Sequence, residues 1–311
     1  MSADFILMFF TRSKTFLLPL GALLALAASP LDAHPQAAPW PSGEKIQLNL
    51  SRGGFDILRY RAKLDSAGAS PKALIVFGTG SGGWSYWEER VCCRLQDDGY
   101  EVLGIDFALY SQGDYDLNIL ESDYQKIVQY GLKACGNRPL PVILGGWSTG
   151  AEQAVAVAGG PQPPFGLVGL LLVSPGSEGA YGKYATNYVN WDTPAAKLFK
   201  LADFSSKLNH LRIAQWHAQL DPLDSCTWLD SLSAPHREFD FDHAIHDYRG
   251  ACNDFLARLT ESVAWILSGD ASSRRVSSKY SVGLPLSVPR LVHSDGNVAV
   301  PTPQIEDGNV Y

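Results

Sequence analysis

Short apolar runs recur through the middle of the chain, and longer segments with amphipathic spacing separate them. Uninterrupted apolar runs of this length are typical of strands that are buried on both faces of a parallel sheet. Gly, Pro or Asp bounds each run, which favours a turn there. The predicted strands are Ala73–Phe77, Val102–Phe107, Val142–Trp147, Leu167–Val173 and Ile213–His217.

The segments between these runs have helical spacing, which predicts helices near residues 86–98, 119–134, 149–158, 193–208 and 247–267. Strands and helices in alternation indicate βαβ units. The expected fold class is therefore α/β, with a doubly wound, mostly parallel sheet flanked by helices. Residues 45–62 alternate apolar and polar positions instead, which predicts an antiparallel hairpin at the edge of the sheet.

The N-terminal segment predicts export. Arg12 and Lys14 precede the apolar run Phe16–Ala28, and small residues follow it, so residues 1–33 are predicted to be a secretory signal peptide. An uncleaved membrane anchor is the alternative, but the run is shorter than the roughly 20 residues that a membrane span needs. We therefore expect a periplasmic or secreted protein.

The rest of the chain divides by composition. Residues 34–44 are Pro-rich and are the expected linker, and residues 45–268 are the expected folded domain. Residues 269–311 are rich in Ser, Gly, Pro and Val without helical spacing, which predicts a mostly disordered tail. No feature of the tail identifies a partner.

Composition and charge narrow the function. Of the 311 residues, 46% are hydrophobic, which is enough for one sizeable core. The net charge is -7 and no basic cluster exceeds Arg274-Arg275, so we expect no nucleic-acid partner. The cysteines are Cys92, Cys93, Cys135, Cys226 and Cys252. Their spacing matches no zinc motif, so we expect neither a metal nor a cofactor. In an oxidising compartment a disulfide between Cys226 and Cys252 is one expectation, and buried free thiols are the other.

The most specific motif is the pentapeptide Gly146-Trp147-Ser148-Thr149-Gly150. It follows the apolar run VILGG and precedes the helix-compatible run AEQAVAVA. This strand–turn–helix context is that of the nucleophile elbow of the α/β-hydrolase fold, in which small residues permit a strained turn. The serine is then presented at a helix N-terminus, where the dipole favours negative charge. We predict Ser148 as a nucleophile; the alternative is a Gly-Ser turn without a catalytic role.

Acyl transfer also needs two backbone N–H donors for the developing oxyanion. Thr149, directly after the nucleophile, is predicted to supply one. The other is expected from the glycine-rich segment 78–83 (GTGSGG), where Thr79 and Gly80 are the candidates. A phosphate-binding loop is the alternative, but the segment has neither a Walker lysine nor the spacing of a dinucleotide site.

In this fold the nucleophile, the acid and the histidine follow one another along the chain. Asp221 comes just after a predicted strand and is the first candidate for the acid, with Asp224 in reserve and an ordinary turn as the alternative. His243 follows the strand-like REFDFD and precedes a long helix, so we predict it as the base, with His246 in reserve.

With these residues in place, the chain resembles the bacterial VirJ/AcvB virulence-protein family, a branch of the α/β-hydrolases, over roughly residues 70–267. The motifs that carry the resemblance are Gly80-Ser81-Gly82-Gly83-Trp84, GWSTGAE, Leu172-Val173-Ser174-Pro175, Asp224-Ser225-Cys226 and His243-Ala244-Ile245-His246-Asp247-Tyr248. The resemblance implies a periplasmic hydrolase with Ser148, Asp221 and His243 as nucleophile, acid and base. One branch of the family is associated with hydrolysis of an aminoacylated phospholipid, lysyl-phosphatidylglycerol.

The chain departs from the family pattern next to the site. The family loop usually has an acidic residue where Ser81 stands, and its elbow usually has Tyr and Phe where Trp147 and Thr149 stand. The His243 loop lacks a second adjacent histidine and the following Phe-Asp. These changes weaken the expectation for the substrate more than that for the reaction.

Aromatic residues are expected to line the substrate pocket, unless they pack a small cap onto the body of the protein. They are Trp84, Trp147, Tyr181, Tyr184, Tyr188 and Trp191. Glu178 and Asp192 are expected to attract a cationic head group.

The expected function is cleavage of a small-molecule or lipid ester, with contact to a membrane surface in the lipid case. Ser148 attacks the ester carbonyl, His243 takes its proton and Asp221 orients the imidazole. The alternatives are a secreted carboxylesterase or polyester depolymerase, and a non-catalytic binding or secretion-accessory protein of the same fold.

Overall fold

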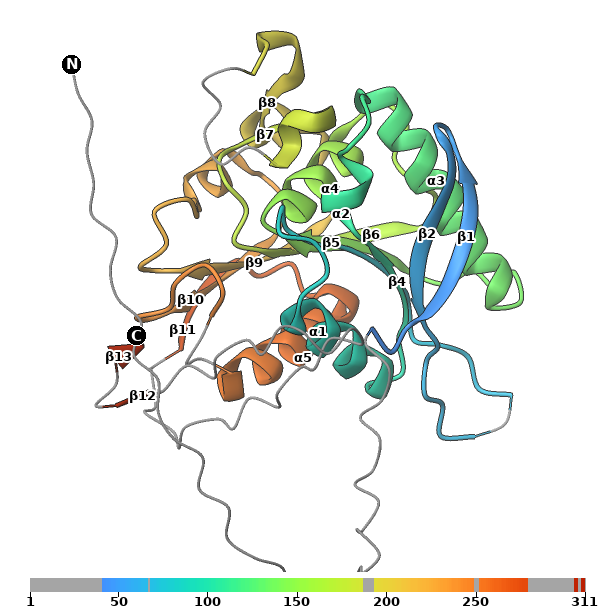
Figure 1. Cartoon of the computed structure of the whole chain (residues 1–311). Helices are drawn as coiled ribbons and strands as arrows, with labels where there is room; N and C mark the ends of the chain where they lie inside the picture. Colours follow the sequence, from blue (N-terminus) through green and yellow to red (C-terminus); the bar gives the residue numbers. More distant parts are fainter. Residues whose placement is uncertain are drawn as a thin grey trace, which may run out of the picture. The chain divides into compact units, whose positions relative to one another are not determined.

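The computed structural model describes residues 41–66, 68–186, 193–248, 252–278, 305–306 and 309–310, all within the compact unit Trp40–Tyr311. In this part of the chain nine strands form one sheet in the order β1-β2-β4-β3-β5-β6-β9-β10-β11 (Figure 1). The strands are β1 (Glu44–Leu50), β2 (Gly53–Tyr60), β3 (Leu74–Gly78), β4 (Glu101–Ile105), β5 (Val142–Trp147), β6 (Leu167–Val173), β9 (Arg212–Ala218), β10 (His236–Phe241) and β11 (Arg274–Ser278). From β4 to β11 all neighbours pair in parallel.

The two faces of the sheet carry different helices. Helices α1 (Tyr86–Asp97) and α5 (Cys252–Ser268) lie on one face, and α2 (Phe107–Tyr110), α3 (Leu117–Ala134) and α4 (Thr149–Gly159) on the other (Figure 1). Successive side chains of a strand point to opposite faces, so each strand contributes to both cores. In β5, for example, Leu144 packs on the side of Val155 in α4, and Ile143 on the side of Phe255 in α5. This confirms the predicted doubly wound sheet and explains its uninterrupted apolar strands.

The predicted edge hairpin is also present, because β1 and β2 pair antiparallel and β2 then joins β4. The predicted helix near residues 193–208 is wrong. That segment contains the 3-10 turns η3 (Ala195–Lys197) and η4 (Leu201–Lys207), with strand β8 (Leu198–Lys200) between them. The reason is a distant partner: β8 pairs antiparallel with β7 (Glu178–Ala180), so its backbone groups bond across to β7 instead of along a helix. Two further 3-10 turns are η1 (Gly182–Thr186) and η5 (Thr227–Ser231).

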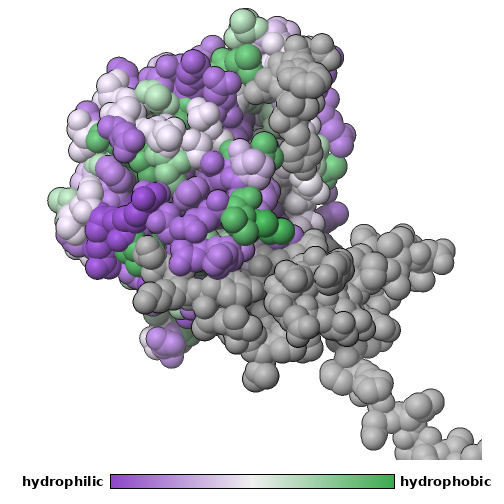
Figure 2. Space-filling model, turned by 90° about the vertical axis from the view of Figure 1, so that its left-hand side faces the viewer, coloured by the Kyte–Doolittle hydropathy of each residue, from purple (hydrophilic) through white to green (hydrophobic). Residues whose placement is uncertain are grey.

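Part of the expected disordered tail belongs to the fold. β11 continues the sheet beyond β10, and Arg275 forms ion pairs with Glu238 and Asp240 of that strand. A sheet edge pairs through its backbone, so a polar segment can extend it without an apolar pattern. Figure 2, viewed from the side of β10 and β11, shows a mostly hydrophilic surface with apolar residues in separate patches. Such a face suits a polar edge strand.

The other predictions for the chain ends stay untested. Residues 1–40, which include the predicted signal peptide and most of the linker, lie outside the described residues, as does most of the tail. Near the C-terminus, β12 (Ile305–Glu306) and β13 (Asn309–Val310) pair antiparallel. Among the described residues, no helix has the length and apolar character needed to cross a membrane.

Candidate active site

Ser148 occupies a strained turn between β5 and α4. Its backbone has φ 48° and ψ -118°, a conformation that side-chain-bearing residues rarely adopt. Neighbouring glycines make the turn possible: a Cβ on Gly146 would lie 2.4 Å from the carbonyl carbon of Gly150, and one on Gly150 would lie 2.4 Å from the oxygen of Gly78. The predicted strand–turn–helix context of the elbow is therefore present, with the serine at the N-terminus of α4.

Ser148 lines a cavity of about 250 Å³ at the carboxyl ends of the parallel strands. This is the edge where ligands bind in open α/β sheets. The cavity is lined by Ser81, Ser148, Thr149, Glu152, Ser174, Gly176, Ser177, Glu178, Gly179, Ala180, Tyr184, Ala185, Thr186, Pro222, Leu223 and His246. The nucleophile predicted from the sequence thus shares a pocket with one of the two candidate histidines.

Asp221 holds that histidine directly. The Oδ2 atom of Asp221 lies 2.5 Å from Nδ1 of His246, and its Oδ1 atom accepts a hydrogen bond from the Leu223 amide at 2.9 Å. The Asp221 side chain is 2% exposed and the His246 side chain 33% exposed. The carboxylate is therefore shielded, while the imidazole remains open to the pocket. We call Ser148, His246 and Asp221 the serine cluster.

Of the two histidines predicted as candidates for the base, the structure places the reserve, His246, beside Asp221 in the pocket, and not the first choice, His243. His243 is exposed, has φ 59° and is not among the residues that line the pocket. The loop brings His246 to the site through two contacts across the chain. The Trp147 indole donates to the His246 carbonyl at 3.1 Å, and the Leu220 amide donates to the Ala244 carbonyl at 2.9 Å. The second contact ties the loop of the acid to the loop of the histidine.

The electrostatics of the pair suit a base and its orienting acid. Burial alone lowers the pKa of His246, but the hydrogen bond and charge of Asp221 outweigh it and raise that pKa above the ordinary 6.5. Burial raises the pKa of Asp221, but the hydrogen bonds from His246 and the Leu223 amide outweigh it and lower that pKa below 3.8. Asp221 therefore stays ionised while His246 titrates.

Asp224, the reserve acid, has a supporting role in the same loop. Its Oδ2 atom accepts hydrogen bonds from the Ala218 amide at 2.7 Å and from the Ser174 hydroxyl at 2.9 Å. That hydroxyl also lies 2.7 Å from the hydroxyl of buried Tyr248. Burial raises the pKa of Asp224 to about 7. These contacts fix the start of the loop and the end of β6, and no contact joins Asp224 to His246 directly among the described hydrogen bonds.

Of the three backbone amides predicted to bind the oxyanion, one is available to a substrate and two already donate hydrogen bonds within the protein. The Thr149 amide, in the first turn of α4, donates no hydrogen bond within the described part of the chain, so it is available to a substrate oxygen. The Thr79 amide already donates to the Ile105 carbonyl at 2.9 Å. The Gly80 amide donates to the buried Glu88 carboxylate, whose pKa burial raises despite this hydrogen bond. Ser81, which lines the pocket, replaces them as the candidate from this loop.

Only Tyr184 of the predicted aromatic lining reaches the pocket among the described residues. Trp84 stacks on Tyr60, and Tyr181 packs against Phe199 with ring centroids 4.6 Å apart. Trp147 is buried on the α5 side of the sheet, where it supports the histidine loop. Tyr188, Trp191 and Asp192 lie outside the described residues. Three of the four described aromatic side chains therefore pack within the fold instead of lining the pocket.

Two acidic residues line the pocket, Glu178 as predicted and Glu152, which sequence reasoning missed. Glu152 lies four residues after Ser148, on the same face of the first turns of α4, and this spacing is the signal that could have found it. Burial raises the pKa of Glu152 to about 7, against the lowering effects of the Gly176 amide and of His246. The Gly176 amide donates to Glu152 at 3.0 Å.

The cysteines follow the free-thiol alternative as far as they are described. Cys92, Cys93, Cys135 and Cys226 are free thiols, so the disulfide between Cys226 and Cys252 is absent. Cys92 is fully buried against α5 and the sheet, as a small apolar side chain would be.

Comparisons with known proteins agree with this fold. A family model described as bacterial virulence protein (VirJ) matches residues 72–158. The esterase domain of a Rhodothermus marinus protein has a TM-score of 0.52 at 15% identity, with 72% of this chain and 98% of that chain covered. A dienelactone hydrolase from Anabaena variabilis has a TM-score of 0.51 at 17% identity, with 72% and 97% covered.

A third solved structure extends the comparison. A soluble variant of monoglyceride lipase from Saccharomyces cerevisiae has a TM-score of 0.51 at 13% identity, with 74% of this chain and 98% of that chain covered. No curated protein sequence matches this chain significantly. At these identities the likeness shows the fold, which is that of the α/β-hydrolases.

Proposed function

We propose that this chain, which has an α/β-hydrolase fold and matches the VirJ family model over residues 72–158, is a serine hydrolase that cleaves carboxylic esters. The observation that carries the proposal is the contact of Asp221 with His246, which lines the same pocket as Ser148. A module that only binds a ligand needs neither a strained serine nor a histidine held by a shielded carboxylate.

The proposed reaction has two halves. His246 accepts the Ser148 proton through its second ring nitrogen, Nε2, as the serine oxygen attacks the ester carbonyl, and Asp221 stabilises the imidazolium. The amides of Thr149 and Ser81 hold the oxyanion. The proton then passes from His246 to the leaving alcohol, which departs. A water molecule releases the acyl group by the same sequence and restores the serine.

We propose further that the acyl part of the substrate is cationic, as in an aminoacyl ester such as a lysyl-phosphatidylglycerol-like lipid. The support is the charge of the pocket, which Glu152 and Glu178 line without a lysine or arginine among its described residues. A cation beside Glu152 would also favour the ionised form of that buried carboxyl. The lipid part of such a substrate implies contact with a membrane surface.

Pre-steady-state hydrolysis tests the reaction class. With a 4-nitrophenyl ester of a short acid, the wild-type protein should release a burst of about one mole of nitrophenol per mole of enzyme, because the acyl-enzyme forms faster than water hydrolyses it. Ser148→Ala should lose the burst and at least about 10⁴-fold in kcat/KM. Ser177→Ala changes another serine that lines the pocket and should keep both. A folded wild-type protein without turnover of any ester would overturn the proposal.

Export is a separate part of the proposal and rests on residues 1–33 alone. The expected location is the periplasm or the medium. Mass analysis of the mature N-terminus after expression of the full chain tests it. A cleaved product that begins between residues 28 and 34 is expected, and an intact N-terminus on a cytoplasmic protein would contradict it.

A further inference from the structure

A second cluster of reactive side chains lies beside the serine cluster on β9, β10 and the turn before η5. The parallel register places His217 opposite Asp240 and Gln215 opposite Glu238. Because residues two apart on a strand share a face, these four side chains project from the same side of the sheet. Trp216, Phe239 and Phe241 point to the opposite side, into the core under α5. Polar groups are thus gathered where the sheet is covered by η5 instead of a long helix.

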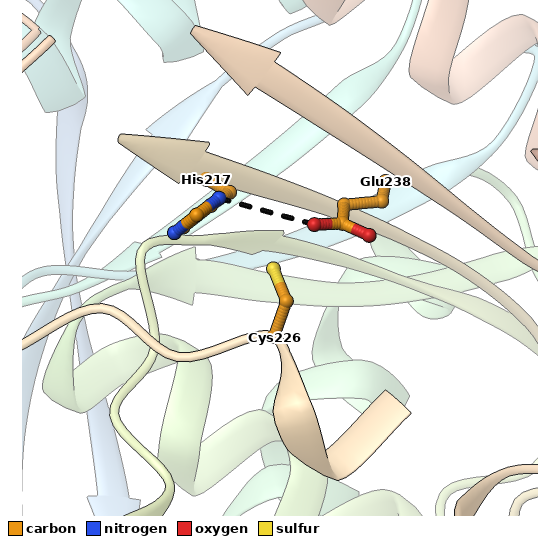
Figure 3. Close-up of side chains that lie close together, drawn as sticks. All are labelled: His217, Cys226 and Glu238. Atoms are coloured by element: carbon orange, nitrogen blue, oxygen red, sulfur yellow. Dashed lines mark ion pairs between the residues drawn. The ribbon is translucent and has the colours of Figure 1, made fainter. Parts of the chain in front are cut away.

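Cys226 completes this cluster from above the strands. Its sulfur and atoms of His217 and Glu238 all lie within 4.8 Å of one another, and each residue is partly accessible (Figure 3). Nδ1 of His217 lies 3.8 Å from Glu238 Oε1, and Figure 3 shows the thiol pointing toward these two side chains. We call His217, Cys226 and Glu238 the thiol cluster.

These three ligand types match zinc. Zinc accepts cysteine sulfur, histidine nitrogen and carboxylate oxygen in one tetrahedral site, whereas magnesium and calcium prefer oxygen alone. Ligand atoms in such a site are about 3.4–3.8 Å apart, since each lies 2.0–2.3 Å from the metal. The thiol cluster needs to close by about 1 Å to reach that spacing. Asp240, with Oδ1 at 3.0 Å from His217 Nδ1, offers a further oxygen for a fourth position.

The side chains around the thiol cluster also carry a net negative charge, which favours binding of a cation. Among the described residues, Arg275 of β11 is the arginine that pairs with both Glu238 and Asp240, and it is 59% exposed. Binding of Zn²⁺ through a Cys226 thiolate displaces one proton to solvent and leaves these groups neutral in sum. The Gln215 amide, which donates to the Cys226 sulfur at 3.2 Å, is already placed to stabilise the thiolate.

We propose that His217, Cys226 and Glu238 form a zinc-binding site that is separate from the serine cluster. The site would hold neutral His217 through Nδ1, with its proton on Nε2. His217 stands before the loop that carries Asp221 and Asp224, and Cys226 ends it. The metal therefore joins both ends of this loop, and its role is to fix the loop rather than to contact the substrate.

Cobalt titration of metal-free full-length protein tests the site without reference to hydrolysis. Co²⁺ should bind once per chain and give the near-ultraviolet absorption of a thiolate–cobalt bond, and Zn²⁺ should displace it. Competition with a chromogenic chelator then gives the Kd of Zn²⁺. Because the thiol must lose its proton, this Kd should fall as the pH rises.

Variants decide which residues hold the metal. Cys226→Ser and Glu238→Gln should each raise the Kd of Zn²⁺ by at least about 100-fold, the upper end of what loss of a mere supporting partner costs. Cys135→Ser changes another partly buried free thiol and should leave it unchanged. Thermal unfolding without metal checks that each variant folds. Added Zn²⁺ should raise the Tm of the wild type and of Cys135→Ser, but not that of Cys226→Ser or Glu238→Gln. No thiolate–cobalt absorption, or equal Kd values in the wild type and both cluster variants, would overturn the proposal.

Discussion

The serine cluster contains a histidine beside an aspartate, and the histidine of the thiol cluster has an aspartate, Asp240, beside it as well. Asp221 lies 2.5 Å from His246, and Asp240 lies 3.0 Å from His217. Both histidines stand at the carboxyl end of the sheet: His217 is near the end of β9, and His246 is in the loop after β10. A histidine beside a carboxylate is therefore not enough to identify a catalytic site in this fold.

The two histidines differ in the groups that lie beside them in addition to the aspartate. His246 opens onto a pocket that a strained serine lines at a helix N-terminus, which suits proton transfer. His217 faces a thiol and a second carboxylate, Glu238, and the acids around it are paired with Arg275. That combination suits coordination of a metal better than transfer of a proton. The predictions below test this division, from the largest expected effect to the smallest.

Replacement of His246 by alanine should give the largest loss of activity, and the same replacement of His243 is its control. His246→Ala should lower kcat/KM for an ester by about 10⁴-fold or more, because the base is lost. His243→Ala should stay within a few-fold of the wild type, because this exposed residue lies away from the pocket. Steady-state kinetics of both variants at one pH measure the contrast. A larger loss in His243→Ala would restore the prediction made from the sequence.

Asp221→Asn should cost about 10³–10⁴-fold in kcat/KM, because the amide cannot hold the reactive tautomer of the imidazole. The wild-type value should rise with pH through an apparent pKa above 6.5, since His246 acts only when neutral and Asp221 raises its pKa. In the variant this inflection should move to lower pH. A pH profile from about 5 to 9 records both, and an inflection that stays in place would separate Asp221 from the titrating group.

The two acids of the loop should respond to pH with opposite signs. The pKa of Asp221 is lowered in the folded protein, so its stabilising contribution is present above the unfolded pKa and is lost as the pH falls. The pKa of Asp224 is raised to about 7, so its contribution is full below the unfolded pKa and is lost as the pH rises from about 4 to 7.

Urea unfolding at pH 5 and pH 8 measures this difference. In the wild type, the buried Asp224 carboxyl should lower the free energy of unfolding as the pH rises from 5 to 8. In Asp224→Asn this decrease should be smaller, by an amount on the order of 2 kcal/mol. Asp97→Asn changes an exposed acid and serves as the control. Equal pH dependence in the wild type and Asp224→Asn would show that the buried carboxyl is not the group that titrates.

Glu152→Gln should give the smallest effect. We expect it to lower the preference for an aminoacyl ester over a neutral acyl ester of the same alcohol by about tenfold, because one pocket charge is lost. The rate with the neutral ester should change less. Ratios of kcat/KM for the two esters give the answer, and an unchanged ratio would remove the support for a cationic substrate.

The elements that were predicted correctly are those whose structure depends on residues close by in the sequence. The limits of β5 and β6 agree with the predicted ranges, and the elbow at Ser148 followed from local spacing, because a strained turn needs glycine at both flanks. The segment 193–208 failed because β8 pairs with β7, which lies about 20 residues earlier. Local amphipathic spacing cannot report a partner at that distance.

The candidate site was predictable to within a loop. Asp221 was predicted from its place after a strand and does contact a histidine, but the two candidate histidines, His243 and His246, are three residues apart in a turn. Their separation depends on the positive φ of His243 and on the contact of Trp147 with the His246 carbonyl. The thiol cluster was missed for a similar reason. Its members are spread over residues 217–238 on three elements, so no short motif marks them.

The most direct test of the central claim is covalent labelling of the nucleophile. A fluorophosphonate should add once to the folded wild-type protein, and peptide mass mapping should place the adduct on Ser148. Labelling should be lost in Ser148→Ala, slowed strongly in His246→Ala and retained in Ser177→Ala. An unlabelled but folded wild type, or an adduct on another serine, would contradict the assignment of Ser148, His246 and Asp221 as the reacting residues.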